Sequence, residues 1–181
     1  MLPIGPLMKE HRKIERMVAL ITNEADRLVA DEAAEPDAEF IFDALMFMRE
    51  YADECHHGKE EQILFRELED REISEEHQKI LDRLLEEHER GRELTASLED
   101  ATERWEGGEH EARGEIIEAL GGMADLYPDH IATEDDDFFM PVMDYFSDQE
   151  KEDMIEDMWD FDHDLFTALY EGCIVEHEAG E

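Results

Sequence analysis

Four histidines and two glutamates are the residues of this chain best placed to do chemistry, because each lies within a helical pattern of apolar residues. The six are His11, His57, Glu61, His88, His130 and Glu134. Imidazole and carboxylate groups are costly in a protein core unless a partner satisfies them. Both are also ligands of transition metal ions. The pattern predicts a metal site that is buried between helices.

The elements that position these residues are expected to be amphipathic helices, whose apolar stripes pack against one another. The inward positions of the first are Leu7, His11, Ile14, Val18, Ile21, Ala25 and Leu28. Those of the third are His77, Leu81, Leu84, His88, Gly91, Thr95, Leu98, Thr102 and Trp105. Those of the fourth are Ile116, Leu120, Met123, Tyr127, His130, Glu134, Phe138 and Pro141.

Short loops between consecutive helices place the four histidines at one level of a four-helix bundle. Residues equally far from the middle of a short loop lie side by side in antiparallel helices. With the first loop centred near residue 34, position 57 lies as far after it as His11 lies before it. With the third loop centred near residue 108, the partner position of His88 is 128, close to His130.

Nearly the whole chain is predicted to be helical, over residues 6–31, 37–69, 75–106, 111–146 and 149–175. The first break falls at Pro36, the second before Ser74, which is expected to cap the third helix, and the third at Gly107-Gly108. Residues 1–146 are expected to form the bundle, and residues 147–181 to add a C-terminal helix to the same domain. An apolar stripe on that helix is expected to pack on the outside of the bundle or to form a homo-oligomer surface; it comprises Ile155, Met158, Trp159, Asp162, Leu165, Phe166 and Leu169.

The ligand set favours a pair of iron ions over a single zinc ion. A structural zinc site usually has four ligands. Carboxylates can join two metal ions, and carboxylate-bridged di-iron sites are built inside helical bundles from residues of facing helices. Four histidines and two glutamates therefore fit a dinuclear iron site.

Composition limits which partners and which cellular location are compatible with the chain. The formal net charge is −38, so a nucleic-acid partner is excluded, because phosphate contacts need a basic surface. No apolar run is long enough to cross a membrane, and no signal-peptide core begins the chain, so a cytoplasmic protein is expected. Cys55 and Cys173 do not form a CxxC pair and are expected to be reduced.

The acidic excess also favours adaptation to a salt-rich, halophilic cytoplasm. The alternative is that 54 acidic residues simply coat solvated helix faces. In molar salt the Debye length falls to about 3 Å, and repulsion within the folded chain is suppressed. We adopt salt adaptation as the hypothesis.

Four segments resemble the hemerythrin-like HHE cation-binding family. CHHGKEEQILF (residues 55–65) and HIATEDDDFFMP (130–141) are similar to its two signature segments, and EHRKIER (10–16) and LLEEHERGR (84–92) to its other two histidine helices. The resemblance covers about residues 6–146. It implies an up-down-up-down bundle with an oxo- or hydroxo-bridged pair of non-haem iron ions that binds dioxygen or a related small molecule. It further implies terminal ligands at His11, His57, His88 and His130, and bridging carboxylates at Glu61 and Glu134.

The chain departs from oxygen-carrying hemerythrins at two positions. Leu84 stands where these proteins have a further histidine, four residues before the one matched by His88. Oxygen carriers also place an aspartate five residues after the last histidine, and here both Glu134 and Asp135 are present. Asp135 is thus an alternative bridge. Candidates for the missing ligand are His56, Glu60, Glu87 and Tyr127.

His56 and His57 compete for one position, because adjacent residues of a regular helix point about 100° apart. Glu61, Leu64 and Leu68 follow His57 at the right spacing and favour His57. The preceding apolar residues Leu45, Met48, Ala52 and Cys55 are out of register with that stripe. We therefore expect a local widening of the helix near Gly58, and such π-bulges often mark functional sites.

The other histidines are expected to lie outside the metal site. His77 shares a stripe with His88, but eleven residues of helix span about 16 Å, too far for one centre. His110 belongs to a loop, and His163 and His177 have no partner pattern. Surface or packing roles are expected for all four.

Several functions remain compatible with this site, and dioxygen binding for storage, delivery or sensing is favoured. The alternatives are a di-iron redox enzyme or repair protein that acts on peroxide or nitric oxide, an iron-responsive or iron-storage module, and a metal-free bundle. The last would leave six buried polar groups without a purpose. We favour binding over catalysis and assign no catalytic residue.

Overall fold

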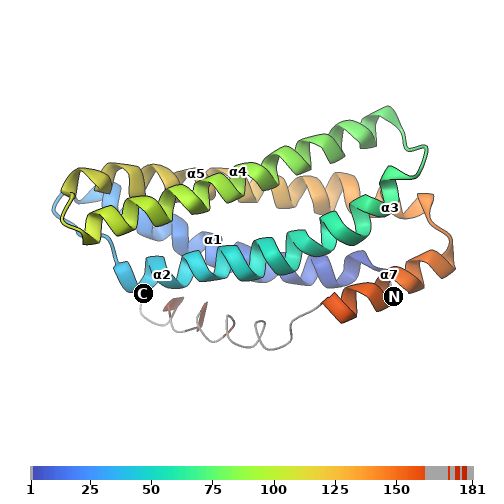
Figure 1. Cartoon of the computed structure of the whole chain (residues 1–181), viewed down its shortest axis with the longest axis horizontal. Helices are drawn as coiled ribbons and strands as arrows, with labels where there is room; N and C mark the ends of the chain where they lie inside the picture. Colours follow the sequence, from blue (N-terminus) through green and yellow to red (C-terminus); the bar gives the residue numbers. More distant parts are fainter. Residues whose placement is uncertain (1, 162–170, 172–173, 176, 179–181) are drawn as a thin grey trace.

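The computed structural model describes residues 2–161, 171, 174–175 and 177–178. Within these residues all regular secondary structure is helical, and the long helices lie side by side (Figure 1). No helix of the described part is long and apolar enough to cross a membrane. The expectation of an all-helical chain is confirmed.

The first two long segments are joined by a short loop. Helix α1 (Ile4–Ala30) is followed by a continuous helical segment made of α2 (Ala38–Met46), η1 (Phe47–His57), η2 (Glu60–Phe65) and α3 (Arg66–Glu69). Asp37 begins this segment, because its side chain accepts a hydrogen bond from the backbone N–H of Phe40 at 3.1 Å. The η1 and η2 stretches are π-helical, as the out-of-register apolar residues indicated.

The third and fourth segments are joined by a tight turn. Helix α4 (Glu75–Glu106) begins at Ser74, whose hydroxyl accepts a hydrogen bond from the backbone N–H of His77. Gly108 allows the turn, since its φ of +95° is one that residues with a side chain rarely adopt. The fourth segment contains η3 (His110–Ala112), α5 (Arg113–Ala132), the π-helical η4 (Thr133–Phe138), α6 (Phe139–Val142) and η5 (Met143–Tyr145).

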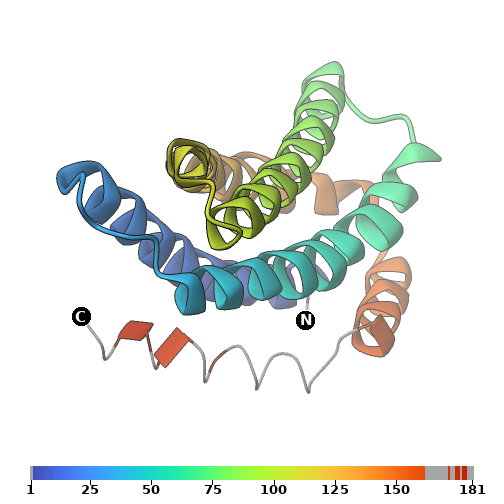
Figure 2. The same cartoon turned by 60° about the vertical axis from the view of Figure 1, so that its left-hand side comes forward.

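Helix α7 (Asp148–Phe161) packs against the end of the second segment, as Figure 2 shows. It begins with the predicted capping box, in which the Glu150 carboxylate accepts a hydrogen bond from the backbone N–H of Ser147 at 2.7 Å. Its buried residues are Met154 and Met158. Of the predicted apolar stripe, Met158 is buried, Ile155 is half-buried and Trp159 is 66% exposed, so Trp159 does not pack on the bundle. A homo-oligomer surface on this helix stays a prediction. Four further members of that stripe lie outside the described residues: Asp162, Leu165, Phe166 and Leu169.

Two apolar clusters form the core, and a polar layer separates them in every long segment. In α1, Leu7 belongs to one cluster and Ile14 to the other, with His11 between them. In α4, Leu84 and Leu94 flank His88 in the same way. The order of the two clusters along the chain reverses from each segment to the next. Every long segment thus contributes its polar residues at the same height.

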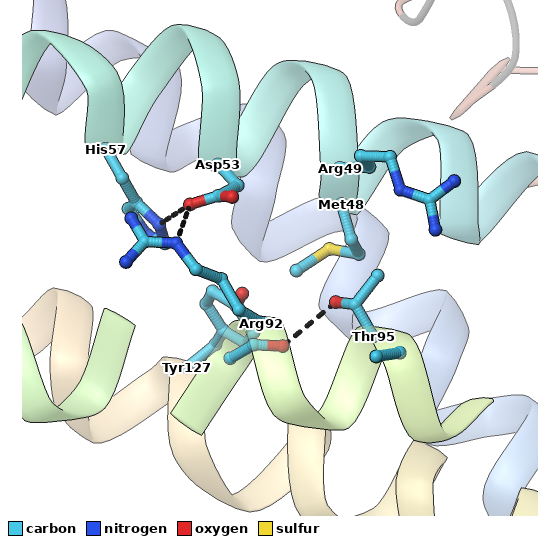
Figure 3. A pocket seen from close by; sticks show the side chains of 9 residues that line it. Met48, Arg49, Asp53, His57, Arg92, Thr95 and Tyr127 are labelled. Atoms are coloured by element: carbon cyan, nitrogen blue, oxygen red, sulfur yellow. Dashed lines mark hydrogen bonds and ion pairs between the residues drawn. The ribbon is translucent and has the colours of Figure 1, made fainter. Parts of the chain in front are cut away.

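A polar contact ties the second segment to α4 beside this layer. The Arg92 guanidinium donates a hydrogen bond from Nε to Asp53 Oδ1 at 2.9 Å, and Figure 3 shows the two side chains meeting between η1 and α4. Thr95 and Tyr127 lie close by in the same view. The contact continues into the histidine cluster through His57, whose Nδ1 lies 3.3 Å from Asp53 Oδ1.

Candidate metal centre

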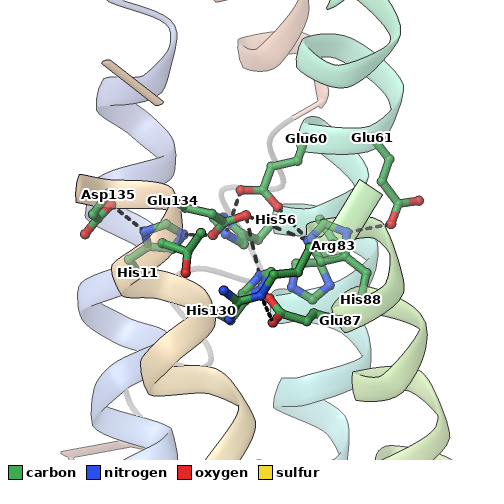
Figure 4. A network of polar contacts seen from close by, with 12 residues as sticks. His11, His56, Glu60, Glu61, Arg83, Glu87, His88, His130, Glu134 and Asp135 are labelled. Atoms are coloured by element: carbon green, nitrogen blue, oxygen red, sulfur yellow. Dashed lines mark hydrogen bonds and ion pairs between the residues drawn. The ribbon is translucent and has the colours of Figure 1, made fainter. Parts of the chain in front are cut away.

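Seven buried side chains converge in the polar layer (Figure 4). Four of them form what we call the four-residue group: His11, His56, Glu60 and Glu134. The other three form the three-histidine group: His57, His88 and His130. Within each group the nitrogen or oxygen atoms that could bind a metal lie within 4.8 Å of one another. Each group can thus surround one cation.

The four-residue group pairs each histidine with a carboxylate. His11 Nε2 lies 3.1 Å from Glu134 Oε2, and His56 Nε2 lies 3.3 Å from Glu60 Oε1. All four side chains are buried, and both glutamates are fully excluded from solvent.

The same two carboxylates reach the three-histidine group with their second oxygens. Glu60 Oε2 lies 3.3 Å from His88 Nε2. Glu134 Oε1 lies 3.4 Å from His130 Nε2 and 3.9 Å from His88 Nε2. Each glutamate therefore has one oxygen toward each group, which is the arrangement needed to join two cations.

The π-helical turns explain why both His56 and His57 enter the layer. The expectation that only one of them could do so assumed a regular helix, with about 100° between adjacent residues. Both residues lie at the end of η1, where hydrogen bonds run to the fifth residue and the helix is wider. The choice of His57 over His56 is therefore not required by the geometry.

Glu61 is placed differently from the other predicted ligands. Its Oε1 lies 2.8 Å from His88 Nδ1, on the side of the imidazole that faces away from the cluster. Glu60 takes the inward position instead. The structure thus brings together His11, His57, His88, His130 and Glu134 of the predicted set and leaves Glu61 outside. The role of all six predicted residues as metal ligands stays a prediction.

A signal for His56 and Glu60 was present in the sequence. Inward residues of this segment recur every four residues, as Met48, Ala52, His56, Glu60 and Leu64. A sustained four-residue step exceeds the 3.6-residue turn of an α-helix and indicates wider winding.

A carboxylate lies behind every histidine of the cluster and holds its Nδ1. The pairs are His11 with Asp135 at 2.8 Å, His56 with Glu10 at 2.9 Å, His57 with Asp53 at 3.3 Å, His88 with Glu61 at 2.8 Å and His130 with Glu87 at 2.9 Å. Such a carboxylate orients the imidazole and selects its tautomer, so that Nε2 is directed inward. Glu87 and Asp135, two of the alternative ligands considered from sequence, have this outer position.

Cations compensate these outer carboxylates. Arg12 contacts Asp135, Lys59 contacts Glu10, Arg83 contacts Glu87, and Arg92 contacts both Asp53 and Glu61. A chain with only 16 lysines and arginines thus uses four of them here. Lys59 is fully buried, which is rare for lysine unless it is paired.

The inward atoms lack hydrogen bonds. Nε2 of His11, His88 and His130 and both oxygens of Glu60 and Glu134 are buried and make no contact with hydrogen-bond geometry. Unpaired buried groups of this kind are destabilising. Nitrogen and carboxylate donors gathered in this way fit a transition metal ion, so the residues present suit metal binding.

The cluster holds its charges in opposed pairs when no metal is bound. Burial lowers the pKa of His11, but the hydrogen bond to Asp135 and the contact with Glu134 outweigh it and raise the pKa to about 10. Burial likewise lowers the pKa of His88, and its contacts with Glu134, Glu60 and Glu61 raise it to about 11. The pKa of His57 falls well below its usual value, because of burial and the charge of His88.

The remaining histidines lie outside the cluster, as expected where they are described. His77 Nδ1 lies 2.9 Å from the Tyr145 hydroxyl. His110 packs on Trp105, and His177 Nε2 lies 2.9 Å from an Asp43 oxygen. His163 lies outside the described residues.

Comparison with known proteins agrees with this geometry. The sequence profile of the family described as "Hemerythrin HHE cation binding domain" matches residues 2–142. No curated protein and no solved structure matches the chain. The matched range contains all seven clustered residues and most of the chain. The protein therefore belongs to the hemerythrin HHE cation-binding domain family.

Proposed function

We propose that the protein holds two non-haem iron ions in the histidine and glutamate cluster. His11 and His56 would bind one ion, and His57, His88 and His130 the other. Glu60 and Glu134 would bind both. The observation that carries the proposal is the common orientation of five imidazoles, each held from behind by a carboxylate, around buried carboxylate oxygens that make no hydrogen bond.

The donor set supports iron rather than zinc. Five nitrogens and two shared carboxylates exceed the four ligands of a structural zinc site. The alternating order of the two apolar clusters along the chain supports an up-down-up-down connection of the four segments, the arrangement in which facing helices present such a site.

We propose that dioxygen or a related small molecule is the ligand of this centre, for storage, delivery or sensing. A bound iron pair supplies the capacity to bind or reduce such molecules. The chain supplies a dry wall on one side, because the ring of Phe139 stacks on His11 at 5.6 Å and that of Phe65 stacks on His88 at 5.8 Å between centroids. Apolar neighbours limit solvent access and tune a metal centre.

Metal analysis and optical spectroscopy test the proposal together. Protein isolated without metal supplementation is expected to contain close to two iron atoms per chain, whereas one zinc per chain would overturn the assignment. The protein is then reduced without air and exposed to oxygen. A visible absorption band that disappears when oxygen is removed supports reversible binding. Irreversible oxidation with turnover of peroxide would instead support the redox-enzyme alternative.

A further inference from the structure

A cavity of about 130 Å³ lies beside the three-histidine group, on the outer side of His57. Its wall includes Asp53 and His57 from η1, Gly91, Arg92 and Thr95 from α4, and Tyr127 from α5 (Figure 3). None of the four-residue group lines it. The cavity has room for several water molecules or for one molecule of a few heavy atoms.

The Tyr127 hydroxyl lines this cavity without a protein partner. The residue is 3% exposed, no described group makes a hydrogen bond to its hydroxyl, and that oxygen is not among the fully enclosed unpaired polar atoms, so the cavity reaches it. Buried tyrosine hydroxyls usually find a partner. A tyrosine hydroxyl is protonated at neutral pH and can donate a hydrogen bond. A hydrogen-bond donor thus faces the cavity beside His57, whose ring lies nearly parallel to that of Tyr127 at 6.4 Å.

Gly91 provides the space that this hydroxyl occupies. A Cβ atom added at Gly91 would lie only 2.8 Å from the Tyr127 hydroxyl oxygen. Glycine in the middle of a helix is about 1 kcal/mol less favourable than alanine. Gly91 is inside α4, and the close approach of the hydroxyl accounts for its presence there.

The charges around the cavity favour an uncharged ligand. Arg92 already donates to Asp53 and to Glu61, at 2.9 and 2.6 Å, and Arg49 donates to Glu99 at 2.7 Å. An anion would have to displace these carboxylates in a chain with a net charge of −38. A cation would meet two guanidinium groups at the wall.

We propose that the cavity is a binding site for a small uncharged molecule that accepts a hydrogen bond from the Tyr127 hydroxyl. The Thr95 hydroxyl, which donates to the Gly91 carbonyl at 2.9 Å, offers an acceptor on the same wall. Molecules of two to four heavy atoms with both a donor and an acceptor belong to the expected class. The site depends on the protein alone and stands whether or not iron is the bound metal.

The test uses the full chain loaded with diamagnetic zinc and labelled with ¹³C at tyrosine Cζ. The chain has four tyrosines, and Tyr127→Phe identifies the Tyr127 signal by its loss. The probes are formamide and formate, which match in size and differ in charge. Formamide is expected to shift the Tyr127 signal in a saturable manner, and formate is not. No saturable shift with formamide, or an equal response to formate, would overturn the proposal. Iron content of protein isolated without metal supplementation tests the metal proposal separately.

Two variants locate the binding in the cavity. Gly91→Ala crowds the hydroxyl and is expected to weaken formamide binding at least tenfold. Gly121→Ala is the matched control, because a Cβ at this helical glycine meets nothing within 4 Å. If Gly91→Ala does not fold, Ala96→Leu replaces it, since Ala96 lies on the exposed rim and a larger side chain there narrows the opening. Unchanged formamide affinity in the folded variant would overturn the proposal.

Discussion

The two halves of the cluster use the same imidazole chemistry in different surroundings. The four-residue group contains both glutamates, and Phe139 covers its His11. The three-histidine group has no carboxylate of its own and borders a polar cavity at His57. Two cations bound here would therefore differ in charge environment and in access to solvent, although both would share Glu60 and Glu134.

The outer cations also differ in exposure, and the most deeply buried of them lies in the four-residue half. Lys59, behind His56, is fully buried with Glu10. Arg92 and Arg83, behind the three-histidine group, have side chains that are 36% and 52% exposed. Charge pairs in a dry interior respond strongly to loss of one partner, whereas solvent weakens the response of exposed pairs. The Lys59–Glu10 pair should accordingly respond most strongly to loss of a partner, whereas the Arg12 side chain, behind His11 in the same half, is 54% exposed.

The largest effect is expected from removing a carboxylate that both halves share. Glu60→Ala or Glu134→Ala should lose at least one of two metal ions per chain, because each glutamate faces both groups. Glu61→Ala should retain both ions and weaken metal binding by about 10- to 100-fold, as removal of an outer partner does. Metal content of purified variants measures this, with His77→Ala as the control. Loss of metal in Glu61→Ala with retention in Glu60→Ala would restore the assignment made from sequence.

A second effect should separate the buried Lys59–Glu10 pair from an exposed pair by its contribution to stability. Lys59→Met leaves the buried Glu10 with His56 as its remaining partner and is expected to lower the free energy of unfolding by up to about 3–5 kcal/mol. Arg92→Gln should cost about 1 kcal/mol, since solvent reaches that pair. Urea unfolding in the presence of a chelator measures both. The double variant Lys59→Met with Glu10→Gln should recover part of the loss, and equal destabilisation by the two single variants would remove the proposed contrast.

Metal binding should release protons from both halves. His11 and His88 have pKa values of about 10 and 11 in the metal-free protein, so both are protonated near neutral pH and must lose a proton to bind a metal. Metal affinity should therefore rise with pH until it passes these values. Calorimetric titration with zinc in buffers of different ionisation enthalpy counts the protons, about one from each half. Heats that do not depend on the buffer would contradict this expectation.

The same pKa shifts have a consequence for stability. A histidine whose pKa rises on folding stabilises the folded state fully below its ordinary pKa of 6.5. That contribution is lost as the pH rises through about 10 for His11 and about 11 for His88. The metal-free protein should thus lose stability at alkaline pH, and thermal melting across this range checks it. No decline in melting temperature would show that these imidazoles are neutral.

The smallest effect should be the salt dependence that remains after metal binding. The net charge of −38 opposes folding at low ionic strength, and salt screens this repulsion. Bound cations relieve the repulsion between Glu60 and Glu134 locally. Melting temperatures between about 0.1 and 3 M KCl should therefore rise more for metal-free than for metal-bound protein. A flat response of the metal-free form would argue against salt adaptation.

Much of the fold was predictable because helical apolar periodicity repeats over many turns. The breaks at Asp37, Ser74 and Gly108 follow from side-chain capping and from glycine geometry, which are local. The common height of His11, His88 and His130 follows from short loops between long helices. Residues at such positions can be placed without knowledge of the rest of the molecule.

The sequence by itself determined the helices, the polar layer and most of the residues that meet in it. Only the tertiary structure decided between Glu60 and Glu61, because π-helical winding changes the direction in which each residue of the turn points. The same winding lets both His56 and His57 enter the polar layer. It also decided which carboxylate stands behind each imidazole. Asp135 reaches His11 from 124 residues away in the chain, and no local pattern encodes a contact between two helices over that distance.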